Sequence, residues 1–185
     1  MIGSLRGRVL EIHVSFFLLE VGGVGYAVKA AGTMLSSLTV GEEKFVYTHD
    51  HIREDIHDVF GFSSSGELEM FQRLLSVSGV GPKVALTIMS VGSLDTIRRA
   101  VTNGDLATLT SVPGVGKKTA QKIILDLKGK LVEEEGMVPG DGEVVEALVS
   151  LGYSAQVARE ILKSVPAHIV DVSARVREAL KYLAK

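Results

Sequence analysis

The nine residues Val112–Ala120 read Val-Pro-Gly-Val-Gly-Lys-Lys-Thr-Ala, and they have a close copy upstream. The copy, Val77–Ala85, reads Val-Ser-Gly-Val-Gly-Pro-Lys-Val-Ala, and an offset of 35 residues aligns the two. In each copy a Gly-Val-Gly turn precedes a segment with the apolar spacing of an amphipathic helix. Glycine permits a tight turn with a positive φ angle and allows another backbone to approach closely. The sequence therefore predicts one unit, a helix followed by a glycine turn and a second helix, repeated once.

Each predicted turn ends where a helix begins, and this position suits a phosphate group. The start of a helix presents unpaired N–H groups and the positive end of the helix dipole. Two such units side by side can hold consecutive phosphates of a duplex without reading its bases. We interpret the repeat as a tandem helix-hairpin-helix motif; the alternative is two ordinary turns, each with a glycine at a helix end. The candidate phosphate-binding residues are Gly79, Gly81, Lys83, Gly114, Gly116, Lys117 and Lys118.

The charge of the chain is distributed unevenly. The net charge of all 185 residues is −2, but residues 1–62 carry −3, residues 63–131 carry +4 and residues 132–185 carry −3. A DNA-binding surface needs local positive potential, and the positive segment is the one that contains the glycine turns.

The absence of cysteine excludes disulfides and thiolate metal sites and is typical of a reducing cytoplasm. We see no signal peptide and no apolar run long enough to cross a membrane, and we expect a cytoplasmic protein.

Residues 1–62 read as a small β-barrel. Alternating and β-rich segments, with Gly22-Gly23 and Gly25 as breakers, predict five strands and a short helix at Thr33–Leu38. This content favours an OB fold, and an SH3-like barrel is the competing interpretation. The strands are expected at Ile2–Ile12, Ser15–Val21, Tyr26–Ala30, Glu43–Ile52 and Val59–Phe62.

The last hairpin of this barrel has two adjacent carboxylates, Glu54 and Asp55, at its tip. Taken alone, such a tip is an ordinary polar turn. Beside a phosphate-binding module it indicates a pin that repels DNA backbones and keeps them apart. Histidines flank the tip, at His49, His51 and His57, but nothing in their spacing fixes the geometry of a metal site. We therefore expect neither a metal nor a cofactor.

Residues 63–131 are expected to be all-α, with Ser93 and Asp105 as N-caps and a last helix from Lys117 to about Leu131. Residues 132–142 are acidic, contain glycine and proline, and predict a flexible linker. Residues 143–185 predict a small bundle of three helices, at about 143–151, 154–164 and 171–184. Because the bundle is net acidic, we expect it to be an adaptor for another protein; the alternative is an appendage that only adds stability.

This order of parts resembles the RuvA family of bacterial Holliday-junction-binding proteins over essentially the whole chain. The resemblance rests on the start Met1–Gly7, the Arg53–Asp55 tip before Phe60–Phe62, both glycine turns, and Leu151–Tyr153. It implies sequence-neutral binding of an open four-way DNA junction by a homotetramer, which a second tetramer can join to form an octamer.

The resemblance also assigns residues and partners. It places the family's acidic pin on Glu54 and Asp55. It implies that the C-terminal, UBA-like bundle docks the hexameric RuvB ATPase, with Leu148, Leu151 and Tyr153 as candidate contacts. A RuvC-type resolvase is the further partner that it implies. In a tetramer, the pins would bring like charges together at the crossover and keep the junction from folding into stacked arms.

Two other functions fit the sequence less well. A DNA glycosylase with this motif needs an aspartate soon after it, whereas here the following segment is the acidic linker, and Asp141 lies within it, 23 residues after Lys118. A phosphate loop of an ATPase is excluded because Ser111 stands where its first glycine belongs. We therefore expect a non-catalytic subunit whose partner hydrolyses ATP. A generic duplex-binding scaffold remains the alternative, and a preference for four-way over linear DNA separates the two.

Overall fold

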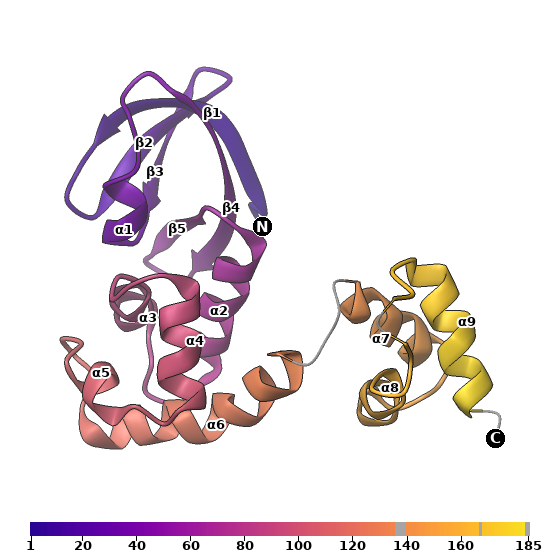
Figure 1. Ribbon diagram of the computed structural model, residues 1–185. Helices are drawn as coiled ribbons and strands as arrows, with labels where there is room; N and C mark the ends of the chain where they lie inside the picture. The colour runs from indigo at the N-terminus through magenta and orange to yellow at the C-terminus, as the bar shows by residue number, and fades with distance from the viewer. Residues whose placement is uncertain (136–139, 167, 184–185) are drawn as a thin grey trace. The chain divides into compact units, whose positions relative to one another are not determined.

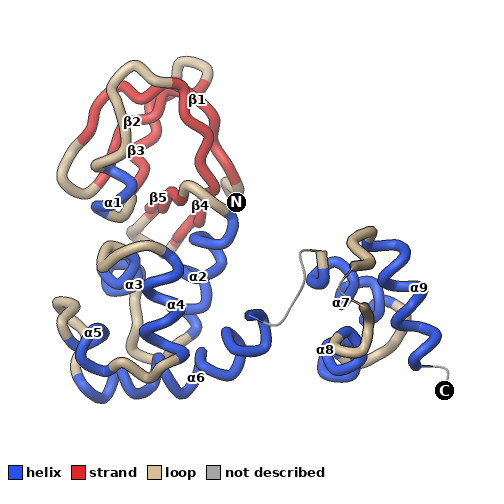
Figure 2. Tube along the Cα trace, viewed as in Figure 1, coloured by secondary structure: helices blue, strands red, loops and turns tan. Residues whose placement is uncertain are grey.

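The computed structural model describes residues 1–135, 140–166 and 168–183, and of residues 132–135 only the backbone. The chain divides into two compact units, Met1–Gly129 and Lys130–Lys185 (Figure 1). Among the described residues, strands occur only at the start of the first unit, and the elements that follow them are helices (Figure 2). Of the described helices, none is both long and apolar enough to span a lipid bilayer.

The first part of the chain is a closed five-stranded barrel. Its strand order is β1-β2-β3-β5-β4, and the parallel pair of β3 with β5, which aligns Val28 with Val59, lies between antiparallel pairs. The barrel is OB-like, as expected. A single short helix, α1, follows the third strand and is shorter than expected. The elements are β1 (Ser4–Ile12), β2 (Phe16–Val21), β3 (Val24–Lys29), α1 (Gly32–Leu35), β4 (Glu43–Ile52) and β5 (His57–Phe62).

One expected strand break is wrong. Gly22 and Gly23 have φ angles of 59° and 85°, so two residues suffice for the turn between β2 and β3. Gly25 therefore lies inside β3, where it pairs with Glu20. In β2 the more deeply buried residues alternate, as the sequence predicts, whereas β5 buries four residues in succession, 59–62. The fully buried core side chains of the barrel are Val9, Phe17, Leu19, Val28 and Val46.

Five described helices follow the barrel and make up the rest of the first unit, except that the end of the last helix lies beyond Gly129. Three begin with a side-chain cap: Ser64, Ser93 and Asp105 each accept a hydrogen bond from the N–H three residues on. The caps expected at Ser93 and Asp105 are thus confirmed. The hydrogen bonds from Thr108, first from its hydroxyl and then from its amide, hold the pKa of Asp105 below its usual value. The helices are α2 (Ser65–Ser76), α3 (Pro82–Met89), α4 (Leu94–Thr102), α5 (Leu106–Thr110) and α6 (Lys117–Glu135).

The barrel and these helices share aromatic packing. Phe71 of α2 is fully buried, and its ring centroid lies 5.2 Å from that of Phe60 and 4.8 Å from that of Phe62. Both partners come from β5, the strand that closes the barrel, and both are buried. The segment Phe60-Gly61-Phe62 thus helps to close the barrel, and it also fixes α2 on the barrel.

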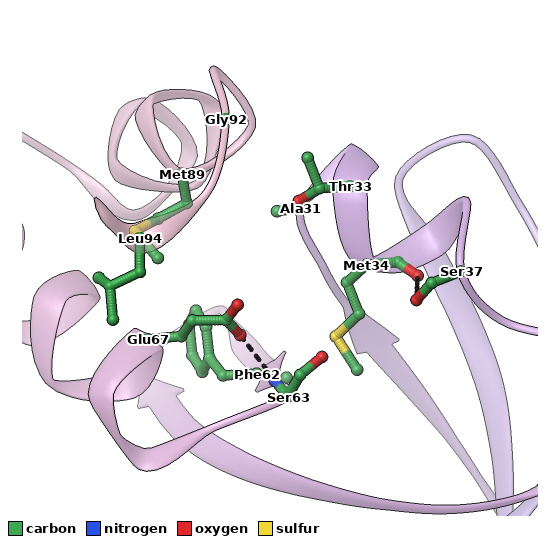
Figure 3. A pocket seen from close by; sticks show the side chains of 11 residues that line it. Ala31, Thr33, Met34, Ser37, Phe62, Ser63, Glu67, Met89, Gly92 and Leu94 are labelled. Atoms are coloured by element: carbon green, nitrogen blue, oxygen red, sulfur yellow. Dashed lines mark hydrogen bonds between the residues drawn. The ribbon is translucent and has the colours of Figure 1, made fainter. Parts of the chain in front are cut away.

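A cavity of about 230 Å³ lies beside this packing, between α1 and the helices (Figure 3). Met34, Phe62, Met89 and Leu94 line it. Its charged group, the Glu67 carboxylate, already accepts a hydrogen bond from the Ser63 N–H at 2.8 Å. The cavity belongs to the joint between barrel and helices.

The second unit is a bundle of three helices, α7 (Asp141–Ser150), α8 (Ala155–Leu162) and α9 (Val172–Leu183). Its core is apolar apart from one ion pair. Arg175 of α9 is buried and donates from Nε to Asp141 Oδ1 at 2.6 Å, and it also donates to the carbonyl groups of Pro166 and Ile169. The buried apolar residues are Val144, Val145, Leu148, Ala158, Leu162, Val165 and Ala179.

The expected linker is shorter than the sequence indicates. α6 continues through residues 132–135, and α7 begins at Asp141. The extension of α6 follows from good helix formers, because three glutamates prolong it. The start of α7 comes directly after Gly140, which has a φ angle of 93°, and its first residue, Asp141, pairs with Arg175 of α9. Residues 136–139, the rest of the expected linker, lie outside the described residues.

Candidate nucleic-acid interface

The two glycine turns have the same backbone structure. The φ angle is 92° at Gly79 and 88° at Gly114, so both positions need glycine. In each turn the valine between the glycines donates its N–H, at 3.0 Å, to the carbonyl of the valine two residues before the first glycine. The valines that bracket both turns are buried: Val77, Val80, Val112 and Val115. The sequence repeat is thus a repeat in three dimensions.

The second glycine of each turn serves another purpose. Neither Gly81 nor Gly116 has a positive φ angle, and each carbonyl accepts the first helical hydrogen bond at 2.9 Å. A Cβ atom built at either position meets no other atom within 4 Å. The space in front of these glycines is therefore open, and it allows a backbone from outside the chain to come close.

The helices behind the turns begin without a side-chain cap. The N-cap of α3 is Gly81, which has no side chain to accept a hydrogen bond. Gly116 stands at the same position before α6. By contrast, α2, α4, α5 and α8 each begin with a serine or aspartate that accepts an N–H hydrogen bond. The first N–H groups of α3 and α6 are thus left for an external acceptor, as at an anion site.

Lysines surround these helix starts. Lys83, Lys117 and Lys118 are exposed, and among the residues that the structure describes none of the three forms an ion pair. The two turns also lie next to each other, because Val84 of α3 is 3.4 Å from the Cβ position of Gly114. All seven predicted phosphate-binding residues therefore belong to one adjacent pair of turns.

The acidic tip lies at the end of the β4–β5 hairpin. The Arg53 N–H donates to the Ile56 carbonyl at 2.8 Å and closes the turn, which leaves Glu54 and Asp55 exposed. Arg53 and Ile56 line a groove whose other wall includes Gly81 and Lys83. The tip and the first glycine turn thus share one surface, which we call the hairpin groove.

The histidines near the tip are parts of the hairpin packing. The ring of His49 lies against that of Phe71, with 5.4 Å between centroids, and partial burial, with His51 nearby, lowers the pKa of His49. His57 pairs with Asp50 at 2.7 Å on the opposite face of the hairpin. Within the described part of the chain, no group of three or more histidine, aspartate or glutamate side chains is placed to hold a metal ion.

Of the three residues expected to contact a partner in the C-terminal bundle, one is buried and two are exposed. Leu148 is 0% exposed and belongs to the bundle core, so its side chain cannot contact a partner, and this assignment is corrected. Leu151 and Tyr153 are 60% and 36% exposed, beside the turn made by Gly152 with its φ angle of 98°.

Two further apolar residues near that turn are exposed, and the sequence analysis missed them. Val149 and Val157 are each 44% exposed. The signal was available for Val149, because it follows the core residue Leu148 and must point to another side of α7. We call Val149, Leu151, Tyr153 and Val157 the α7–α8 patch.

The chain resembles known proteins along its entire length. Three family models match: "RuvA N terminal domain" over residues 1–61, "SAM-like Helix-hairpin-helix tandem" over 71–129, and "RuvA, C-terminal domain" over 142–184. A relative from Chloroflexus aurantiacus is 40% identical over 191 residues, which cover 98% of both chains. One from Laribacter hongkongensis is 41% identical over 202 residues and covers both chains completely. Both bear the name Holliday junction branch migration complex subunit RuvA. This chain therefore belongs to the RuvA family.

Proposed function

We propose that this protein binds four-way DNA junctions by their shape, independently of sequence, and holds them open for branch migration. The observation that carries the proposal is the adjacent pair of glycine turns, with uncapped helix starts and exposed lysines, on the same unit as an acidic tip. The turns offer contacts to phosphates, which carry no sequence information. A junction that moves through any sequence requires such neutral contacts.

The acidic tip gives the binding its shape dependence. Carboxylates repel phosphates, so Glu54 and Asp55 destabilise any arrangement in which DNA backbones crowd together beside them. A linear duplex can contact the turns without approaching the tip. At a four-way junction, the strands separate and leave room for the tip. In a homotetramer, four tips would meet at the crossover and favour the open, square form.

The same chain is proposed to act without catalysis of its own. Asp141, the first aspartate after the acidic segment, is buried and paired with Arg175, so it is not placed as the base of a glycosylase. The relatives are named as subunits of a complex, which supports a separate motor protein. We infer that this motor is the hexameric RuvB ATPase, that it docks on the α7–α8 patch, and that the complex works on DNA in the cytoplasm.

The test of junction binding compares two DNAs of equal length and composition, one four-way and one linear. A gel-shift titration should show tighter binding to the junction, with affinity for both falling steeply as salt rises. Equal affinities would favour a generic duplex-binding scaffold. Light scattering with and without the junction gives the mass of the complex, and a mass other than four or eight chains would contradict the symmetric assembly.

Docking of the motor is tested on the patch itself. Leu151→Ser removes an exposed apolar side chain, so stability and junction binding should hold while stimulation of the motor's branch migration falls. Val40→Ser, an exposed apolar residue in the barrel, is the matched control. Unchanged stimulation in the Leu151 variant, with binding intact, would count against this docking surface.

A further inference from the structure

The hairpin groove has a volume of about 570 Å³ and lies between two regions to which the proposed function gives opposite tasks. One wall comes from the barrel and includes Lys29, Arg53 and Asp58. The other comes from the first glycine turn and includes Lys83 and Leu86. The groove thus connects the repelling tip to a turn that attracts phosphate.

Lys29 is held in a fixed place within this groove. Its Nζ atom lies 2.6 Å from Asp58 Oδ2, and it stands 5.9 Å from the centre of the Phe60 ring. The side chain is 42% exposed, so the ammonium group is oriented without being enclosed. An ammonium group has three donors, and the pair with Asp58 occupies one of them. Two donors are therefore available to an oxygen anion in the groove.

The balance of charge in the groove is positive. Lys29, Arg53 and Lys83 are basic side chains, and Asp58 is the one acidic side chain among the described residues of the lining. His51 adds an imidazole that can donate a hydrogen bond. Phe60 and Leu86 add apolar surface to the lining. Cationic groups beside apolar surface match a sugar-phosphate backbone, whose phosphates are anionic and whose sugars are largely apolar.

We propose that the hairpin groove binds the backbone of the DNA strand next to the crossover, with Lys29 as its central phosphate ligand. Arg53 and Lys83 contact the flanking phosphates. This inference rests on the proposed junction binding and adds a third phosphate site to the two glycine turns. It also explains where the acidic tip directs the DNA. A strand that Glu54 and Asp55 repel can bind the positively charged groove beside them, and the groove leads to the first glycine turn.

The test uses the full-length protein and the same four-way and linear DNAs. Lys29→Gln removes the charge and should weaken junction binding about tenfold, with little change for the linear duplex. The dependence of junction affinity on salt should become shallower as well. Lys29→Arg should retain most of the binding. Lys44→Gln, near the start of β4 and far along the strand from the hairpin, is the matched control and should behave as wild type.

The variant Asp58→Asn shows whether Lys29 contacts DNA or only stabilises the hairpin. If Lys29 binds phosphate, removing the carboxylate releases the ammonium group and lowers the negative charge, so junction affinity should hold or rise. If the Lys29–Asp58 pair only braces the hairpin, both variants should weaken binding alike, and the inference would be wrong. Thermal unfolding of both variants checks that the fold is retained.

Footprinting locates the contact. Hydroxyl-radical cleavage of the junction should show protected sugars next to the crossover, and Lys29→Gln should remove that protection while leaving the protection along the arms. Loss of protection along the arms instead would place Lys29 outside the crossover and overturn the inference. A wild-type protein that does not prefer the junction at all would contradict the proposed function, whatever the Lys29 variants do.

Discussion

The two glycine turns share one backbone structure but differ in their charges and their surroundings. The first turn has Pro82 and Lys83 where the second has Lys117 and Lys118. Proline has no N–H, so the first turn offers one donor fewer and one lysine fewer. In return, the first turn forms a wall of the hairpin groove, next to the acidic tip. The difference indicates a division of tasks, in which the second turn holds the arm and the first positions the strand at the crossover.

The largest expected effect follows from the lysines. Replacing Lys117 and Lys118 by glutamine should weaken binding to junction and linear duplex alike, by about a hundredfold, whereas Lys83→Gln should cost about tenfold. For every phosphate that a variant no longer neutralises, the salt slope should also decrease by about 0.9. Fluorescence anisotropy across a salt series measures both quantities. Equal losses of affinity at the two turns would contradict the proposed division.

The glycines allow stability to be separated from binding. Gly79→Ala and Gly114→Ala place a Cβ on a residue with positive φ, which should cost about 1–2 kcal/mol of folding free energy each. Gly81→Ala and Gly116→Ala are free of that strain, so they should leave Tm nearly unchanged and weaken DNA binding by obstructing the open space. Denaturant unfolding and anisotropy on the same four variants measure the contrast. Normal DNA binding by Gly81→Ala and Gly116→Ala would argue against close approach of a backbone.

Removing the charges of the acidic tip should change the binding of the junction, where the first turn positions the strand, and not the binding of a linear duplex. With Glu54→Gln and Asp55→Asn together, junction binding should hold or become several-fold tighter because a repulsion is removed. Linear duplex binding should not change, and the rate of branch migration with the motor should. Glu43→Gln, at the far end of β4, is the control. Markedly weaker junction binding in the double variant would contradict a repulsive role.

The smallest expected effect depends on pH. The folded state lowers the pKa of His49, so below its ordinary value of 6.5 the unfolded chain binds the proton more readily than the folded one. Stability from this residue is thus complete above pH 6.5 and decreases as the pH falls through the lower, folded value. Comparing the pH dependence of unfolding for wild type and His49→Gln measures it. An identical pH dependence would show that His49 does not contribute.

The repeat Val77–Ala85 and Val112–Ala120 could be found from sequence because glycines with positive φ and buried valines are local requirements. The caps at Ser93 and Asp105 were predictable for the same reason. The hairpin groove was not, because Lys29 and Lys83 come from distant segments that only the fold brings together.

Helical periodicity also left the bundle surface undecided. Leu148 and Val157 both lie at apolar positions of a helix, yet Leu148 is buried and Val157 is exposed. The difference depends on how closely the three helices pack against one another, which periodicity does not show. The roles proposed for Glu54, Asp55 and the lysines depend on bound DNA, and they remain predictions.

The buried pair of Asp141 and Arg175 bears on how the C-terminal bundle withstands mechanical pulling. Asp141 is the first residue of α7, and Arg175 joins it to α9 and to the carbonyl groups of Pro166 and Ile169. A pulling force applied to the chain before α7 therefore acts first on Asp141, where hydrogen bonds connect α7, α9 and the segment from Pro166 to Ile169. Under load from a working motor, the bundle should resist as a whole up to a threshold, instead of unravelling turn by turn from its first helix.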